Sequence, residues 1–287
     1  MDALIFIDTN IFLDFYRIRK SDVSMSYLEL IDKHKDLIIL GSQVEMEFKK
    51  NRQKVILETL NKFKNPDWNN LSVPALLSEL QASKQIEKKK KEICTQQKKV
   101  TEKIIKVLKN PPSNDPVYQT LQRLFKHKSP YNLDRSKKER YAVRNLARKR
   151  FVLGYPPRKK EDNSIGDAVN WEWIIRCAQE SGKHVILVTR DTDFGAIVKN
   201  ESFLNDWLSQ EFKERVSRTR KIILTERLSV AFKAVKLTVS KAMEKAEDEI
   251  IEANEAEASE PVGNRSAEFL RLIKFFQEAS ANAQKNK

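Results

Sequence analysis

The chain has 287 residues, of which 40% are hydrophobic and 33% charged, so it can bury a core beneath a strongly polar surface. Its six glycines, nine prolines and two cysteines exclude a collagen-like chain, a disulfide framework and a cysteine-rich zinc site, and no apolar run is long enough for a membrane helix. The formal net charge of +14 favours a polyanionic partner, most often nucleic acid.

Short apolar runs separated by helical patterns predict a parallel sheet. The runs cover residues 4–7, 37–40, 185–188 and 222–224. Helices are predicted around or between them, over residues 11–15, 24–35, from Ser42 onward, 76–109, 117–127, 136–152, 165–181, 202–216 and 227–240. Strands that are apolar throughout and alternate with helices are typical of an α/β fold with helices on both faces of the sheet.

The helix starts carry capping signals. Ser42 with Glu45, and Ser164 with Asp167, have the spacing of a capping box, and Gly182 predicts the end of the second of these helices. A capping role alone would explain Glu45 and Asp167 without any chemistry.

The pattern divides the chain into a core and two additions. We expect the core in residues 1–64 and 156–240, and a basic helical insertion in residues 65–155. Residues 241–287 are predicted to be an acidic linker followed by an amphipathic helix that begins at Ser266. That last helix could dock on its own chain, on a second copy in a homodimer, or on a partner protein. With few cysteines and no secretory signal pattern, we expect the protein to be cytoplasmic.

The charges are unevenly distributed along the chain. Residues 84–110 contain ten lysines and three acids, and residues 123–160 contain fourteen basic residues and two acids. The balance reverses in residues 161–200, with seven acids and four bases, and in residues 241–260, with eight acids and two lysines. This layout suits a protein that attracts phosphates and holds a cation among carboxylates.

Acidic residues stand where a parallel sheet would place a site. Asp8 follows the first apolar run and Asp191 the third, and the carboxyl ends of parallel strands share one edge. Carboxylates gathered there would repel one another unless a hard cation such as Mg²⁺ or Mn²⁺ lay between them. Such an ion can activate water against a phosphodiester. The candidate acids are Asp8, Glu47, Asp167 and Asp191, with Asp193 as a possible fifth. Asp8 could instead form only an Asx-turn, and Glu45 could replace Glu47.

Four short motifs resemble the PIN-domain nuclease family. They are Asp8-Thr9-Asn10, Glu47 before Phe48, Gly166-Asp167-Ala168 and Val188-Thr189-Arg190-Asp191-Thr192-Asp193-Phe194. The resemblance implies a three-layer α/β/α fold with a short parallel sheet, and Mg²⁺- or Mn²⁺-dependent hydrolysis of RNA, less often of DNA. It also implies that Asp8, Glu47, Asp167 and Asp191 are catalytic acids, that Asp193 assists at the metal, and that Thr9, Asn10 and Thr189 orient the acids.

The basic insertion is the predicted nucleic-acid interface. Its candidate contacts are Tyr131, Tyr141, Arg144, Arg148 and Lys149, although the tyrosines could simply pack between helices. The favoured hypothesis is a metal-dependent endoribonuclease. A structure-specific DNA nuclease and a catalytically inactive nucleic-acid-binding module remain the alternatives.

Overall fold

The computed structural model describes residues 1–18, 20–64, 74–157, 164–198 and 201–259. Its central feature is a parallel five-stranded sheet with the strand order β3-β2-β1-β4-β7. The strands are β1 (Ala3–Ile7), β2 (Ile38–Gly41), β3 (Asn132–Leu133), β4 (His184–Val188) and β7 (Ile222–Thr225). All but β3 were predicted. The two residues of β3 are too few to carry a strand pattern of their own.

Strand β1 lies in the middle of the sheet. All five of its residues are buried, which is why the strand is apolar throughout rather than alternating. It pairs with β2 on one side and with β4 on the other, where Ile7 lies opposite Val188. Because the chain leaves β1 toward β2 and returns later as β4, the carboxyl ends of β1 and β4 border the crevice where such sheets bind ligands.

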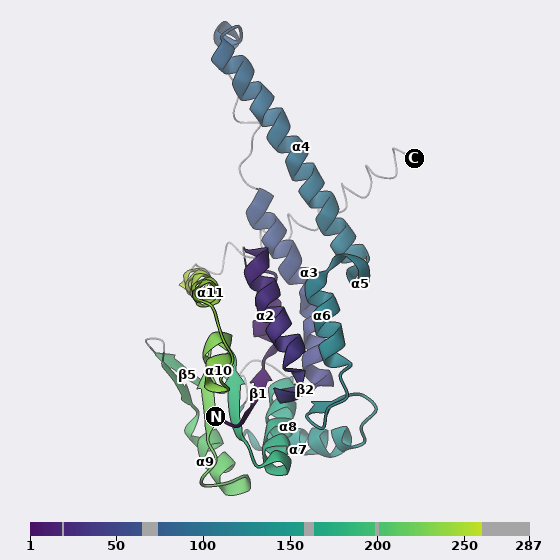
Figure 1. Cartoon of the computed structure of the whole chain (residues 1–287), viewed down its shortest axis with the longest axis vertical. Helices are drawn as coiled ribbons and strands as arrows, with labels where there is room; N and C mark the ends of the chain where they lie inside the picture. Colours follow the sequence, from purple (N-terminus) through teal and green to yellow (C-terminus); the bar gives the residue numbers. More distant parts are fainter. Residues whose placement is uncertain (19, 65–73, 158–163, 199–200, 260–287) are drawn as a thin grey trace.

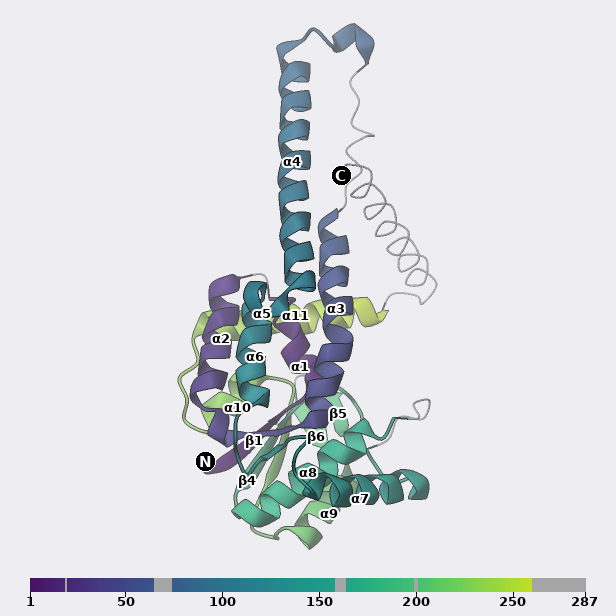
Figure 2. The same ribbon diagram turned by 90° about the vertical axis from the view of Figure 1, so that its right-hand side faces the viewer.

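Helices cover both faces of the sheet (Figures 1 and 2). Helix α8 (Gly166–Ser181) contacts β2 and β4, and α7 (Glu139–Leu153) and α9 (Asp206–Arg215) pack against it. The other layer contains α2 (Ser21–Lys33), α6 (Pro116–Phe125), α10 (Leu228–Ala234) and α11 (Lys241–Ser259). The short α1 (Thr9–Asp14) packs on α3 (Ser42–Lys64). This arrangement confirms the predicted three-layer α/β/α fold.

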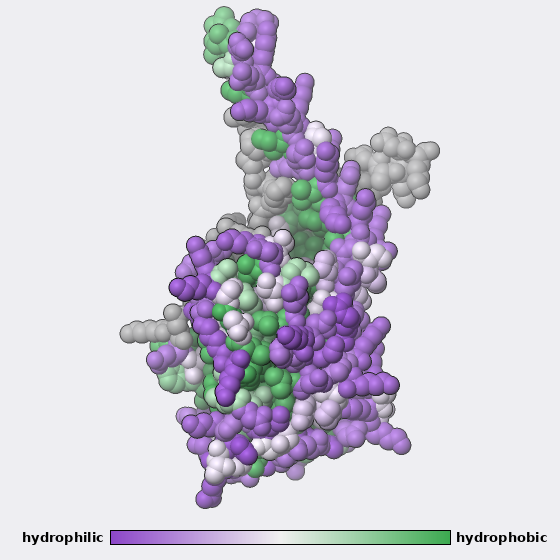
Figure 3. All heavy atoms as spheres, viewed as in Figure 1, coloured by the Kyte–Doolittle hydropathy of each residue, from purple (hydrophilic) through white to green (hydrophobic). Residues whose placement is uncertain are grey.

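A helical arm stands away from this body. Helix α4 (Gln81–Lys109) rises beside the second half of α3, and Figure 2 shows its far end well clear of the sheet and its covering helices. Figure 3 shows that α4 is hydrophilic over most of its visible length. Apolar residues gather near its tip, where Leu76, in the short 3-10 helix η3 (Ala75–Leu77), is 93% exposed.

The second half of the expected insertion belongs to the body. After α4 and the short α5 (Pro111–Asn114), helix α6 buries Leu121 and Leu124 in the main core, and β3 pairs with β2 at Gly41 and Leu133. Residues 116–133 of the expected insertion are therefore packed with the body rather than in a separate subdomain. The apolar faces of α6 and α7 could be read locally, but their burial against the sheet depends on long-range packing.

Two short antiparallel strands stand where the sequence predicted the start of a helix. Strands β5 (Gly195–Val198) and β6 (Glu201–Leu204) pair antiparallel, so the helix predicted over 202–216 is wrong for its first residues. A Cβ on Gly195 would collide with the carbonyl oxygen of Phe203, so the close pairing requires glycine. Helix α9 begins only after Asn205, whose side chain accepts hydrogen bonds from the backbone N–H groups of Trp207 and Leu208.

The acidic segment after residue 240 is a docked helix, not a linker. Helix α11 packs on α2 and α10 and buries Met243, Ala246 and Ile250. Buried Glu247 accepts hydrogen bonds from the backbone N–H of Leu228, at the start of α10, and from the Tyr27 hydroxyl. The predicted last helix, from Ser266, lies outside the described residues. Within the described ranges, no helix is both long and apolar enough to cross a membrane.

Candidate active site

Asp8 occupies the junction between the central strand and the first helix. Its backbone N–H donates to the Val188 carbonyl (3.0 Å), which ties the end of β1 to the end of β4. Its Oδ1 accepts the Thr9 backbone N–H (2.6 Å), and its Oδ2 accepts the Thr189 hydroxyl (2.6 Å) and the Asn10 amide (3.1 Å). The residue is 6% exposed, so these contacts hold the carboxylate in one orientation.

The surroundings of Asp8 disfavour its negative charge. Burial raises the pKa of Asp8 to about 6, from an ordinary value of 3.8, although the hydrogen bonds from Thr189 and Thr9 act to lower it. The carboxylates of Glu47 and Asp191 raise the pKa further. Glu47 and Asp191 are therefore each close enough to Asp8 for the negative charges to repel.

Glu47, rather than Glu45, faces Asp8. Its Oε2 accepts the Thr9 hydroxyl (3.0 Å) and its Oε1 accepts the Gln43 amide (2.6 Å). Glu45 lies elsewhere on the circumference of α3 and pairs with Lys49 (2.6 Å). The two glutamates are two residues apart and so point in different directions on a helix.

The start of α8 lies against Glu47. A Cβ on Gly166 would come within 2.5 Å of Glu47 Oε1 and 2.8 Å of Gln43 Nε2. The absence of a side chain on Gly166 therefore allows the two helices to meet. The Ser164 hydroxyl accepts the Gly166 backbone N–H (3.2 Å), and Asp167 follows in the first turn, half-buried.

The loop after β4 brings the remaining acids to the same edge. The Asp191 backbone N–H donates to the Thr189 hydroxyl (2.9 Å), and the Asn10 amide also donates to that hydroxyl (3.1 Å). One threonine thus links Asp8, Asn10 and the loop that carries Asp191. Asp191 and Asp193 are both half-buried.

A buried ion pair that the sequence analysis missed supports this loop. Arg190 forms an ion pair with Asp14 at the end of α1, and both side chains are largely buried. The pair joins the helix that follows Asp8 to the loop that carries Asp191. An arginine between Thr189 and Asp191 was visible in the sequence, but nothing local indicated that it turns inward.

The predicted nucleic-acid contacts divide into two groups. Tyr141 is 56% exposed, and Arg148 and Lys149 are exposed on α7. Tyr131, in contrast, packs against the core, and its carbonyl accepts the Trp173 indole N–H (3.2 Å). Arg144 is half-buried and lines a cleft described below.

The donor chemistry fits a hard divalent cation. In the part of the chain that the structure describes, no three His, Cys, Asp or Glu side chains lie close enough to hold an ion as they stand. An ion that bound three of the acids would have to draw their side chains together. The carboxylate oxygens of Asp8 and Glu47 accept hydrogen bonds yet retain lone pairs, and oxygen ligands are those that Mg²⁺ and Mn²⁺ prefer. A cation would also offset the effect of burial and, to a smaller extent, of the neighbouring carboxylates, which together raise the pKa of Asp8.

Comparison with known families adds one finding. The sequence profile of the PIN domain matches residues 5–194, which is more than half of the chain. No curated protein and no solved structure matches the chain. The matched range contains the acids and the threonine described above, and it also includes the arm and α7.

Proposed function

The chain belongs to the PIN-domain family, and on this basis we propose that it is a metal-dependent endoribonuclease that hydrolyses RNA phosphodiester bonds. PIN domains are generally nucleases, and they typically use divalent metals. The observation that carries the proposal is the buried carboxylate of Asp8. It is held at the end of the central strand, close enough to Glu47 and Asp191 for their charges to raise its pKa. A mutually repelling group of carboxylates at this edge favours a divalent cation.

In this proposal Asp8, Glu47, Asp167 and Asp191 hold Mg²⁺ or Mn²⁺, with Asp193 as a further ligand. The bound ion would supply an activated water and stabilise the charge that develops on the phosphate. The chain's own contribution is preorganisation. Thr189 and Asn10 hold Asp8, and Thr9 and Gln43 hold Glu47, so their remaining lone pairs keep one direction.

The basic surface supplies the affinity for nucleic acid. Arg148 and Lys149 are exposed on α7, and α7 packs on α8, whose first turn contains Asp167. Contacts from such residues to phosphates carry little sequence information and weaken as salt rises. Together with the net charge of +14, they favour a nucleic acid that lies along α7 and reaches the acids at the start of α8.

The direct test compares substrates and metals. The protein is incubated with single-stranded RNA, single-stranded DNA and a flapped DNA duplex, each with Mg²⁺, Mn²⁺ or a chelator. We expect internal cleavage of RNA that needs a metal and is lost in Asp8→Asn, Asp167→Asn and Asp191→Asn, while circular dichroism shows that the variants fold. Glu47→Gln should lose most of the activity, whereas the matched control Glu45→Gln, on the same helix, should retain it.

The same assay separates the alternatives. Cleavage confined to the flapped duplex would replace the proposal with a structure-specific DNA nuclease. Binding of RNA without cleavage under any metal would identify an inactive nucleic-acid-binding module.

A further inference from the structure

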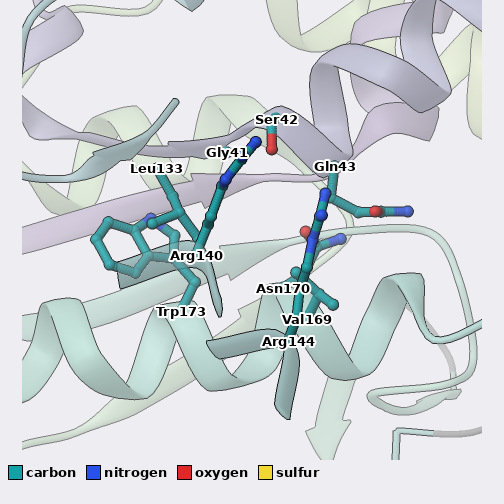
Figure 4. A pocket seen from close by; sticks show the side chains of 9 residues that line it. All are labelled: Gly41, Ser42, Gln43, Leu133, Arg140, Arg144, Val169, Asn170 and Trp173. Carbon is teal, nitrogen blue, oxygen red and sulfur yellow. The ribbon is translucent and has the colours of Figure 1, made fainter. Parts of the chain in front are cut away.

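A small cleft opens beside the acidic residues. It lies between α7, α8 and the junction of β2 with α3, and its empty space measures about 300 Å³ with its open mouth included. Figure 4 shows Arg140 and Arg144 reaching from α7 toward Ser42 and Gln43 at that junction. Asn170 of α8 forms part of the wall. The proposed catalytic acids do not line it.

The walls of the cleft present hydrogen-bond donors that lack acceptors. Asn170 is 3% exposed, yet among the described residues its amide Nδ2 has no hydrogen-bond partner, and Arg140 Nε is likewise buried without one. Within the described ranges, neither Arg140 nor Arg144 has a carboxylate partner. Buried N–H groups without acceptors destabilise the free protein, and structures rarely retain them without a reason. Two guanidinium groups and an amide around one space make a site for an anion with several oxygens.

The side chains around the cleft are held in place. Arg140 donates from Nη2 to the Tyr141 hydroxyl (2.7 Å) and lies 4.7 Å from the centre of that ring. Trp173 donates its indole N–H to the Tyr131 carbonyl, so its ring forms a fixed wall. A preformed arrangement of this kind reduces the entropy that binding would otherwise lose.

Gln43 joins the cleft to the acidic residues. It lines the cleft, and its amide donates to Glu47 (2.6 Å). Asn170 is also one helical turn after Asp167, so both lie on the same side of α8. An anion in the cleft would therefore lie next to the carboxylate cluster but outside it.

We infer that this cleft binds a backbone phosphate of the nucleic-acid strand, next to the phosphodiester at the acids. Arg144 and Arg140 contact the phosphate oxygens and Asn170 donates its free amide N–H. The inference rests on the proposed function, because it takes the strand to be the substrate of the acidic site. It assigns Arg140 and Asn170 to substrate binding. It also gives Arg144 a role that the exposed basic residues of α7 lack, because Arg144 contacts the strand inside a preformed cleft and they contact it on the open surface.

Binding measured without cleavage tests this inference. In the Asp8→Asn protein, fluorescence anisotropy gives the affinity for a short single-stranded RNA and for copies in which one phosphate at a time is a neutral methylphosphonate. At one position the replacement should weaken binding by about tenfold, the range of one lost charge-assisted contact. In Arg144→Gln the methylphosphonate at that position should cause almost no further loss of affinity. In Arg144→Lys, which keeps the charge, part of the tenfold loss should return. Arg148→Gln, on the exposed side of the same helix, should lower the overall affinity for RNA but leave the full tenfold effect of the methylphosphonate at that one position.

Asn170→Leu provides an independent measurement. It should reduce the methylphosphonate effect at the same position and raise the thermal unfolding temperature, because it removes a buried donor that has no acceptor. A structural role for Asn170 predicts the reverse: lower stability with an unchanged phosphonate effect. That result would overturn the inference, as would the absence of any position coupled to Arg144, equal coupling to Arg148, or no binding of RNA.

The outcomes also separate this inference from the proposed function. Coupling at one phosphate in a protein that never cleaves RNA would support the cleft and refute the nuclease. Metal-dependent cleavage by the unmodified protein without such coupling would support the nuclease and refute the cleft.

Discussion

Replacing the buried carboxylate of Asp8 by a neutral amide should stabilise the metal-free protein. At pH 7.5 Asp8 is ionised in the native state even though its pKa is raised to about 6 from 3.8 in the unfolded chain. That difference corresponds to about 3 kcal/mol of unfavourable free energy in the native state. In Asp8→Asn the new amide loses fewest contacts when its NH₂ takes the place of Oδ1, where it faces the Thr9 backbone N–H; this one lost hydrogen bond offsets about 1 kcal/mol. A net gain of about 2 kcal/mol in the free energy of unfolding is therefore expected.

The pH dependence identifies the source of the gain. Because the native pKa of Asp8 lies above the unfolded one, the native state binds the proton more tightly than the unfolded chain does. The stability that this proton supplies is fully present below pH 3.8 and is lost as the pH rises through 6. The unfavourable free energy should fall by about half between pH 7.5 and pH 5, so the net advantage of Asp8→Asn should fall from about 2 kcal/mol to about 0.6 kcal/mol. Urea unfolding followed by circular dichroism in the presence of a chelator measures both values.

The controls isolate the carboxylate cluster. Glu45→Gln, which breaks only the pair with Lys49 on the surface of α3, should give no gain in stability. Adding Mg²⁺ or Mn²⁺ should stabilise the unmodified protein more than Asp8→Asn, because the ion binds the native acids. An Asp8→Asn protein that is no more stable at pH 7.5, or whose advantage does not change with pH, would refute the reasoning.

Three further changes test other parts of the site. Asp14→Asn removes the ion pairs of Asp14 with buried Arg190 and with Arg17, so the free energy of unfolding should fall by about 3 kcal/mol in urea titrations. Gly166→Ala places a methyl group against Glu47, whose side-chain end can move aside. The cleavage rate should therefore fall at least tenfold, a rise of about 1.4 kcal/mol or more in the activation free energy, while calorimetry shows little change in the unfolding temperature. Lys149→Glu should lower RNA affinity and reduce the slope of log affinity against log salt by about one, whereas an unchanged slope in anisotropy titrations would show that no phosphate lies there.

The sequence by itself determined the sheet and the position of the acids that follow its strands. Uninterrupted apolar runs indicate strands buried on both faces, and such strands run parallel with their carboxyl ends at one edge. Asp8 and Asp191 could therefore be assigned to that edge although they are far apart in the chain. Gly182 likewise marked the end of α8, where the backbone has a left-handed conformation (φ 64°).

Only the tertiary structure decided which side chains turn toward one another. Glu45 and Glu47 have the same chemistry, and their orientation depends on how α3 lies against α1. The docking of α11 depends on partners distant in sequence, which no local pattern specifies. The cleft is the clearest case, because Arg144 and Asn170 come from separate helices. Hydrophobic periodicity shows which face of a helix or strand is buried, but not which other element packs against that face.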